Sequence, residues 1–147
     1  MINPQDLQLA VVTKLREIPA LLDLVGDEHA IQAYDDESQI NGTLENAEFS
    51  MLGTSVLVGW TGAELPREGE TRGWTHHLKI VLNADGILAY FTLAQTILDG
   101  TAEGDCDSFL NSEIHPDCDG IQNAELTPEP GDDRVGRLSL SFTLTEK

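Results

Sequence analysis

Within the C-terminal segment 134–145, residues 138–145 alternate apolar and hydroxyl-bearing side chains with a period of two. Its apolar positions are Leu138, Leu140, Phe142 and Leu144, and its hydroxyl positions are Ser139, Ser141, Thr143 and Thr145. Because successive side chains of a strand point to opposite faces, this pattern predicts a strand with one buried face and one solvated face. One-sided strands are typical of antiparallel sheets, whereas strands of parallel sheets are apolar on both faces. The chain is therefore expected to fold around an antiparallel sheet with a second layer over its apolar face.

Two earlier segments predict the strands of a β-hairpin. Segment Phe49–Trp60 is rich in residues with high β propensity, and in Trp74–Leu82 every second residue shares one face. The intervening Thr61–Gly73 contains three glycines and one proline and is expected to be a long loop at the end of the hairpin. Shorter strands are expected at Ile31–Tyr34 and Gly120–Leu126.

Helix signals are clearest at the N-terminus. Asn3 can cap a helix, Pro4 fits its first position, and apolar side chains recur at helical spacing at Leu7, Val11, Leu15 and Ile18. Pro19 ends this helix and starts a short second one, which Gly26 closes.

A second main helix is expected between Asn83 and Gly100, with Asp85 as its candidate cap. Its expected apolar stripe consists of Ile87, Tyr90, Phe91, Ala94, Ile97 and Leu98. Because hairpins dominate the order of elements, we expect an α+β fold: a mostly antiparallel sheet of four to five strands, with two main helices packed on one face. The 147 residues have the size of a single domain, with an acidic, loop-rich insertion expected at about residues 101–133.

The charge of the chain excludes several classes of function. It has 26 Asp and Glu against 8 Lys and Arg, a formal net charge of −18. So few cations cannot neutralise the phosphates of bound nucleic acid or attach the chain to an anionic membrane. No apolar run is long enough to span a bilayer, and no secretory signal opens the chain, so a cytoplasmic protein is expected. A solvated acidic surface is the simplest interpretation of the charge. Adaptation to high salt in a halophilic host is a more specific interpretation.

Motifs that carry chemistry are absent from the sequence. There is no G-x-S-x-G, P-loop, H-E-x-x-H or dinucleotide-binding glycine pattern, so neither enzymatic activity nor a cofactor is expected. Cys106, His115 and Cys118 lie within 13 residues, but they lack the paired C-x-x-C spacing of zinc sites, so no metal is expected. A disulfide between the two cysteines, adventitious cation binding at 117–120 and a small metal-dependent enzyme remain as alternatives.

The cations are grouped in a way that favours contact with other proteins. Residues 17–66 contain ten acidic residues and residues 80–133 contain twelve, and neither stretch has a Lys or Arg. Arg67 and Arg72 lie between them on the expected hairpin loop, where they can pair with the acidic surface of a neighbouring copy. Trp60 and Trp74 flank that loop, either stacked as core or as interface anchors. The candidate interface residues are Trp60, Arg67, Arg72, Trp74, Arg134 and Arg137.

The opening pattern resembles a known family. An amphipathic helix, then the segment I-P-A-L-L-D-L-V-G from Ile18 to Gly26, then I-Q-A-Y-D-D from Ile31 to Asp36, is similar to the tail terminator (tail-completion) proteins of long-tailed bacterial and archaeal viruses. The hairpin, the second helix and the alternating C-terminal strand follow the same order, whereas the acidic segment 101–133 departs from it.

The resemblance implies a structural protein of the virion. Such proteins form a ring, usually a hexamer, on the end of the tail tube, where it stops tube growth and joins the neck or head-completion protein. Assembled in the host cytoplasm, the ring would sit at the tail–neck junction and let DNA pass without specific binding, with no contact to a membrane. A neck or head–tail connector protein and a soluble acidic inhibitor, such as an immunity protein or DNA mimic, are the alternative functions.

Overall fold

The computed structural model describes residues 1–33, 54–69, 73–84, 86–104, 106–128 and 138–147. Its centre is a five-stranded sheet with the strand order β1-β2-β3-β5-β4. The strands are β1 (Ile31–Ala33), β2 (Ser55–Glu64), β3 (Thr75–Asn83), β4 (Gln122–Pro128) and β5 (Leu138–Thr145). Only the β1–β2 pair is parallel, and the other three pairs are antiparallel.

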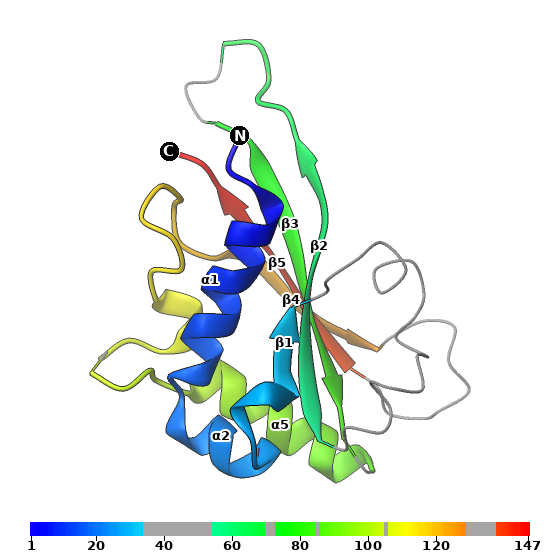
Figure 1. The fold of residues 1–147 in the computed structure, drawn as a ribbon. Helices are drawn as coiled ribbons and strands as arrows, with labels where there is room; N and C mark the ends of the chain where they lie inside the picture. The colour runs from blue at the N-terminus through cyan, green and yellow to red at the C-terminus, as the bar shows by residue number, and fades with distance from the viewer. Residues whose placement is uncertain (34–53, 70–72, 85, 105, 129–137) are drawn as a thin grey trace.

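Three helices cover one face of this sheet (Figure 1). They are α1 (Pro4–Arg16), α2 (Pro19–Val25) and α5 (Ile87–Asp99), with short 3₁₀ helices at η1 (Glu28–Ala30) and η3 (Phe109–Asn111). The buried side chains of the helices and of one face of the sheet form one hydrophobic core. The expected α+β fold with helices on a single face of the sheet is confirmed.

The N-terminal helices form as their sequence predicts. The Asn3 side chain accepts a hydrogen bond from the backbone N–H of Gln5 at 3.0 Å, which satisfies a donor that the first turn of α1 leaves free. Leu7, Val11 and Leu15 are fully buried, so the period of 3.6 residues gives the core-facing side correctly. Gly26 ends α2 with φ of +79°, a conformation that L side chains rarely adopt.

Helix α5 differs from its prediction at its start and on its buried side. It begins at Ile87 after Gly86, with no capping side chain, and the candidate cap Asp85 lies outside the described residues. Its buried residues are Tyr90, Leu93, Ala94 and Ile97. Ile87 and Phe91, expected in the stripe, are each 52% exposed. Because α5 carries apolar residues on more than one side, periodicity alone does not define the face that packs.

The β2–β3 hairpin is longer than expected. Strand β2 continues to Glu64, so residues 62–64 pair with β3 instead of forming a loop, after a register shift between Trp60 and Gly62. Residues 49–53, which we expected to start this strand, lie outside the described residues. In β3 the predicted buried face is confirmed, because His76, Leu78, Ile80 and Leu82 are at most 1% exposed, but the alternation ends at Val81, which is fully buried on the other face.

The hydroxyl face of β5 is less solvated than the alternation predicts. Ser139, Thr143 and Thr145 are buried, and only Ser141 is partly exposed. The reason is position: β5 lies between β3 and β4, and the hydroxyl groups pair with neighbouring strands, as Thr145 does with Thr75 at 3.1 Å. The prediction that the hydroxyl face of β5 is exposed to solvent was therefore wrong, whereas the predicted burial of its apolar face is confirmed.

Part of the acidic segment after α5 belongs to the core. Phe109 is 1% exposed and meets Phe142 of β5 edge to face, with ring centroids 6.2 Å apart. Ile114 and Cys118 are buried against the same cluster. The backbone N–H of Glu103 donates to the carbonyl of Glu17 at 2.8 Å, which ties the segment to the end of α1. The part of this segment between Glu103 and Cys118 thus packs with the helical layer, whereas Gln122–Pro128 forms β4 of the sheet.

Candidate functional site

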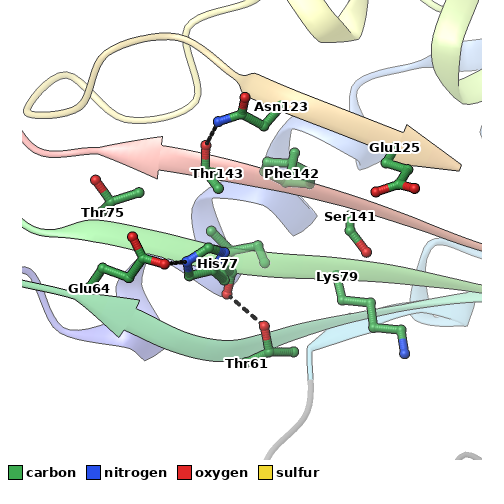
Figure 2. Close-up of a pocket in the computed structure, with 11 residues that line it drawn as sticks. Thr61, Glu64, Thr75, His77, Lys79, Asn123, Glu125, Ser141, Phe142 and Thr143 are labelled. Carbon is green, nitrogen blue, oxygen red and sulfur yellow. Dashed lines mark hydrogen bonds and ion pairs between the residues drawn. The ribbon is translucent and has the colours of Figure 1, made fainter.

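The face of the sheet opposite the helices carries an open polar groove of about 520 Å³. It lies over β2, β3, β5 and β4, and Figure 2 shows its side chains standing on these strands. The polar lining residues are Thr61, Glu64, Thr75, His77, Lys79, Asn123, Glu125, Ser141 and Thr143. Hydroxyl, amide and charged groups of both signs therefore line one surface, together with the apolar Leu78 and Phe142.

Strand register places the charged residues of the groove in one row. Ser141 of β5 is paired with Lys79 of β3 on one side and with Glu125 of β4 on the other. The Cα atoms of Lys79 and Glu125 are therefore two strand spacings apart, about 10 Å. Figure 2 shows Glu125 over Ser141 and Lys79 extending from β3 across β2. Among the described residues, neither Glu125 nor the Ser141 hydroxyl has a hydrogen-bond or ion-pair partner.

A β-bulge shapes the β4 side of the groove. The pairing of β4 with β5 shifts between Gln122 and Glu125, and Asn123 has φ of +55° within the shift. The Asn123 amide donates to the Thr143 hydroxyl at 3.1 Å, and that hydroxyl donates to the Gln122 carbonyl at 3.2 Å. These hydrogen bonds stabilise the bulge. A bulge changes the direction in which neighbouring side chains of a strand point, here those of the edge strand β4.

The other side of the groove contains an exposed contact between a histidine and a carboxylate. The His77 Nε2 lies 3.2 Å from a carboxylate oxygen of Glu64, and the two side chains are 40% and 72% exposed. The Thr61 hydroxyl donates to the His77 carbonyl at 3.3 Å, across the β2–β3 hairpin. With this exposure the pair contributes little to stability, so its groups are free to exchange partners with a bound molecule.

Beyond β2, residues 65–69 form the described part of the end of the hairpin, and we call these residues the arm. Figure 1 shows the hairpin reaching beyond the rest of the body and past both termini. The expected interface residue Arg67 is exposed on the arm, beside the 67% exposed Leu65. The other expected interface arginines, Arg72, Arg134 and Arg137, lie outside the described residues.

The two tryptophans do not stack on one another. Trp60 has its ring contact with His76, at a centroid distance of 6.4 Å, and its indole N–H donates to His76 Nδ1 at 3.0 Å. Trp60 and Trp74 are both partly buried. Of the two alternatives for this pair, the stacked one is not observed, because Trp60 turns its polar N–H toward the buried imidazole of His76, which accepts the hydrogen bond.

His76 connects the base of the arm to both termini. Because its Nδ1 accepts from Trp60, its proton lies on Nε2, which is 2.7 Å from a Glu146 carboxylate oxygen. The same oxygen accepts from the backbone N–H of Ile2 at 3.2 Å. A histidine–carboxylate pair also orients catalytic histidines. Here His76 is fully buried, and its other nitrogen accepts the hydrogen bond from Trp60, so both ring nitrogens are occupied within the fold.

The environment of Glu146 favours its charged form. Burial raises the pKa of Glu146, but hydrogen bonds from His76 and from the Ile2 backbone, together with the N-terminal charge, outweigh it and hold the pKa below the ordinary 4.5. A carboxylate with a lowered pKa stabilises the fold above its unfolded pKa, and this contribution is lost as the pH falls through the folded value.

We expect the substitution Glu146→Gln to lower the free energy of unfolding at neutral pH. The difference in the free energy of unfolding between wild type and variant should become smaller as the pH falls below about 4.5, because the wild-type carboxylate is then protonated and, like glutamine, uncharged. Urea unfolding at pH 7 and pH 3 measures the gap. Glu113→Gln, at an exposed position, is the control and should show no gap at either pH. A Glu146→Gln gap that stays constant down to pH 3 would contradict this role.

The cysteine alternatives are not realised in the structure. Both thiols are free, Cys106 exposed and Cys118 buried, so the disulfide considered above does not form. Burial, with the nearby carboxylates of Glu146, Asp117 and Asp119, raises the pKa of the Cys118 thiol to about 11, which leaves it protonated and unreactive. Within the described ranges, no three His, Cys, Asp or Glu side chains gather to hold a metal ion.

The projecting end of the hairpin was predicted from the sequence, whereas the groove beside it was not. His77, Glu125 and Ser141 are scattered along the chain, and only the register of β3, β5 and β4 brings them together.

No helix in the described part of the chain is long and apolar enough to cross a membrane. Neither known protein families nor curated proteins give a match to this chain.

Proposed function

We propose that this chain is a virion structural protein of the tail terminator type. Copies of it form a ring, most simply a hexamer, on the end of a tail tube. One face of the ring meets the last layer of tube protein, and the other meets a neck or head-completion protein. The chain acts through complementary interfaces and carries out no reaction of its own.

The observation that carries the proposal is the combination of fold and arm. The elements follow the order expected from the resemblance, from the capped first helix to the alternating last strand. Their two-layer body leaves the hairpin projecting beyond it (Figure 1). A projecting segment beside an open polar groove gives one small domain two different surfaces for contact with its neighbours, as closure of a ring requires.

The charge is consistent with a ring that DNA crosses. A net charge of −18 repels phosphates, so DNA passing a lumen lined by this chain is not held there. The same repulsion acts between copies, and salt screens it, with a Debye length of about 3 Å at 1 M. Assembly of the ring is therefore expected to be favoured at high salt.

Electron microscopy of the purified chain in molar KCl tests the proposal. Closed rings with a central hole support it. Single particles that bind a basic nuclease tightly and block its activity would instead identify the acidic inhibitor, because such an inhibitor needs no ring. Rings that also hold DNA firmly at this salt would contradict passage of DNA through the lumen.

A further inference from the structure

We propose that the outer face of α5 is a self-complementary contact surface, through which two free copies of the chain pair with their α5 helices antiparallel. We define this outer face by the exposed residues Ile87, Leu88, Phe91, Thr92 and Gln95. The inference goes beyond the proposed function and does not depend on it. A contact of one surface with itself joins two copies and cannot alone close a six-membered ring.

The first turns of α5 carry a group of exposed apolar side chains. Leu88 is 79% exposed, and Ile87 and Phe91 are each 52% exposed. At these spacings the three side chains lie on one side of the helix. The other large apolar side chains that are exposed in the described ranges lie on separate segments, at Met1, Leu9, Leu24, Leu65 and Leu126. Single exposed apolar residues are ordinary, whereas a group of them on one face is typical of a contact site.

The outer face of α5 is also free of charge. Residues 86–98 contain no Asp, Glu, Lys or Arg, although the chain has a net charge of −18. The exposed sides of α1 and α2, by contrast, carry Asp6 and Asp23. Copies that approach through acidic surfaces repel one another, and a basic partner is attracted to those acidic surfaces instead. Of the three helices, α5 is therefore the one that suits an apolar partner and lets two copies meet with least repulsion.

A shallow groove of about 270 Å³ continues this face toward α2, which lies beside α5 (Figure 1). Its lining residues, most of them short, are Ala20, Thr92, Gln95, Thr96, Asp99 and Gly100. The Thr92 hydroxyl donates to the Leu88 carbonyl at 2.9 Å, and the Thr96 hydroxyl donates to the Thr92 carbonyl at 2.7 Å. Neither hydroxyl therefore needs a partner from outside the helix, so the groove can receive an apolar side chain.

The projecting side chains and the groove lie toward opposite ends of the same helix. Leu88 and Phe91 belong to the first turns of α5, and the groove follows its second half. When two copies of α5 lie antiparallel, the first turns of each face the second half of the other. Phe91 of each copy then lies over the groove of the other copy, and every contact is made twice, as two-fold symmetry requires. A different protein would need a matching projection and groove, whereas a second copy already has both.

The antiparallel arrangement also places the one charged residue of α5 favourably. Asp99 is the last residue of the helix, so its carboxylate would lie level with the first turn of the other copy's α5. The backbone N–H groups of a first turn favour a nearby carboxylate. The charge that ends the helix therefore does not oppose the pairing.

The size of the contact predicts a weak dimer. Helix α5 has 13 residues, which makes it about 20 Å long and about 10 Å wide. Each partner of a stable complex buries about 800 Å², which is more than a strip of these dimensions offers. We therefore expect pairing at micromolar or higher concentrations. We also expect salt to strengthen it, because salt screens the repulsion between two chains of charge −18.

Sedimentation velocity in molar KCl, up to millimolar protein, tests the contact. The wild-type chain is expected to form a concentration-dependent dimer. Leu88→Glu is expected to weaken it by about tenfold or more, because a carboxylate is then buried between apolar surfaces near Asp99 of the other copy. Leu88 is 79% exposed and glutamate is a good helix former, so circular dichroism and melting temperature should be unchanged. Leu9→Glu makes the same change at a 50% exposed position of α1 and is the control.

Cross-linking tests the antiparallel arrangement. In a Cys106→Ala background, where the remaining Cys118 is buried, Ile87→Cys and Asp99→Cys place thiols at opposite ends of α5. An antiparallel pair brings position 87 of one copy beside position 99 of the other. A mixture of the two variants is therefore expected to cross-link through a short bismaleimide, and Ile87→Cys alone is not. Efficient cross-linking of Ile87→Cys with itself would mean that the helices lie parallel and would overturn the arrangement.

The outcomes separate this inference from the proposed function. A wild-type chain that forms no dimer under these conditions, or a dimer that Leu88→Glu leaves intact, would overturn the α5 contact. Rings seen in either case would leave the proposed function standing. Rings that Leu88→Glu abolishes would make α5 a contact of the ring itself and would contradict the two-fold pairing.

Discussion

Replacing Phe109 by alanine is expected to lower the free energy of unfolding by about 3–5 kcal/mol. Phe109 is 1% exposed and packs edge to face on Phe142, so the substitution removes a large apolar side chain from the core. It also detaches η3 and its neighbours from the helical layer. Equilibrium unfolding in urea, followed by circular dichroism, measures the loss.

Phe91→Ala is the matched control for this prediction. It removes the same side chain from α5, where Phe91 is 52% exposed. Its effect is expected to stay within about 1 kcal/mol, since a half-exposed side chain has less burial to lose and alanine favours the helix. Equal losses for the two variants would mean that residues 106–119 do not pack as described.

Gly100→Ala is expected to destabilise the fold by about 1–3 kcal/mol, through overpacking. A Cβ atom at this position would lie 2.4 Å from the Thr96 carbonyl oxygen and 2.7 Å from Ile18 Cγ2. Ile18 is 1% exposed, so it has no free space to move into. The φ of Gly100, −71°, is one that any residue adopts, so backbone conformation does not require glycine here. Glycine is required because the end of α5 approaches Ile18, at the start of α2, this closely.

Gly120→Ala serves as the comparison, because nothing lies within 4 Å of a Cβ atom built there. Thermal unfolding of the two variants is expected to show a lower melting temperature for Gly100→Ala only. Equal melting temperatures for both variants and wild type would mean that α5 and Ile18 are not packed this closely.

Local signals predicted the elements whose side chains face one layer only. The cap at Asn3, the period of α1 and the apolar face of β5 each follow from a few neighbouring residues. Prediction failed where an element carries apolar residues on more than one side, because the sequence does not show which side packs on the sheet. Phe91 and Leu93 of α5 are both apolar, and only packing on the sheet decides that Leu93 is buried.

The candidate site was predictable only in part. The arm follows from glycines, proline and charges that are close in sequence. The groove depends on pairing between Lys79, Ser141 and Glu125, which are far apart in sequence, and on a bulge that has no local signature. Likewise, the hydrogen bond from Trp60 to His76 depends on the register of the β2–β3 hairpin. That register could not be predicted, because the expected loop was too long to fix which residues of the two strands pair.

Native mass spectrometry of the wild-type chain, over a range of concentrations and from molar salt, tests most directly whether the protein works by assembling with itself. A hexameric ring predicts a dominant species close to six times the 16.0 kDa of one chain, which breaks down as salt is lowered. A single 16.0 kDa species at every concentration and salt would contradict it.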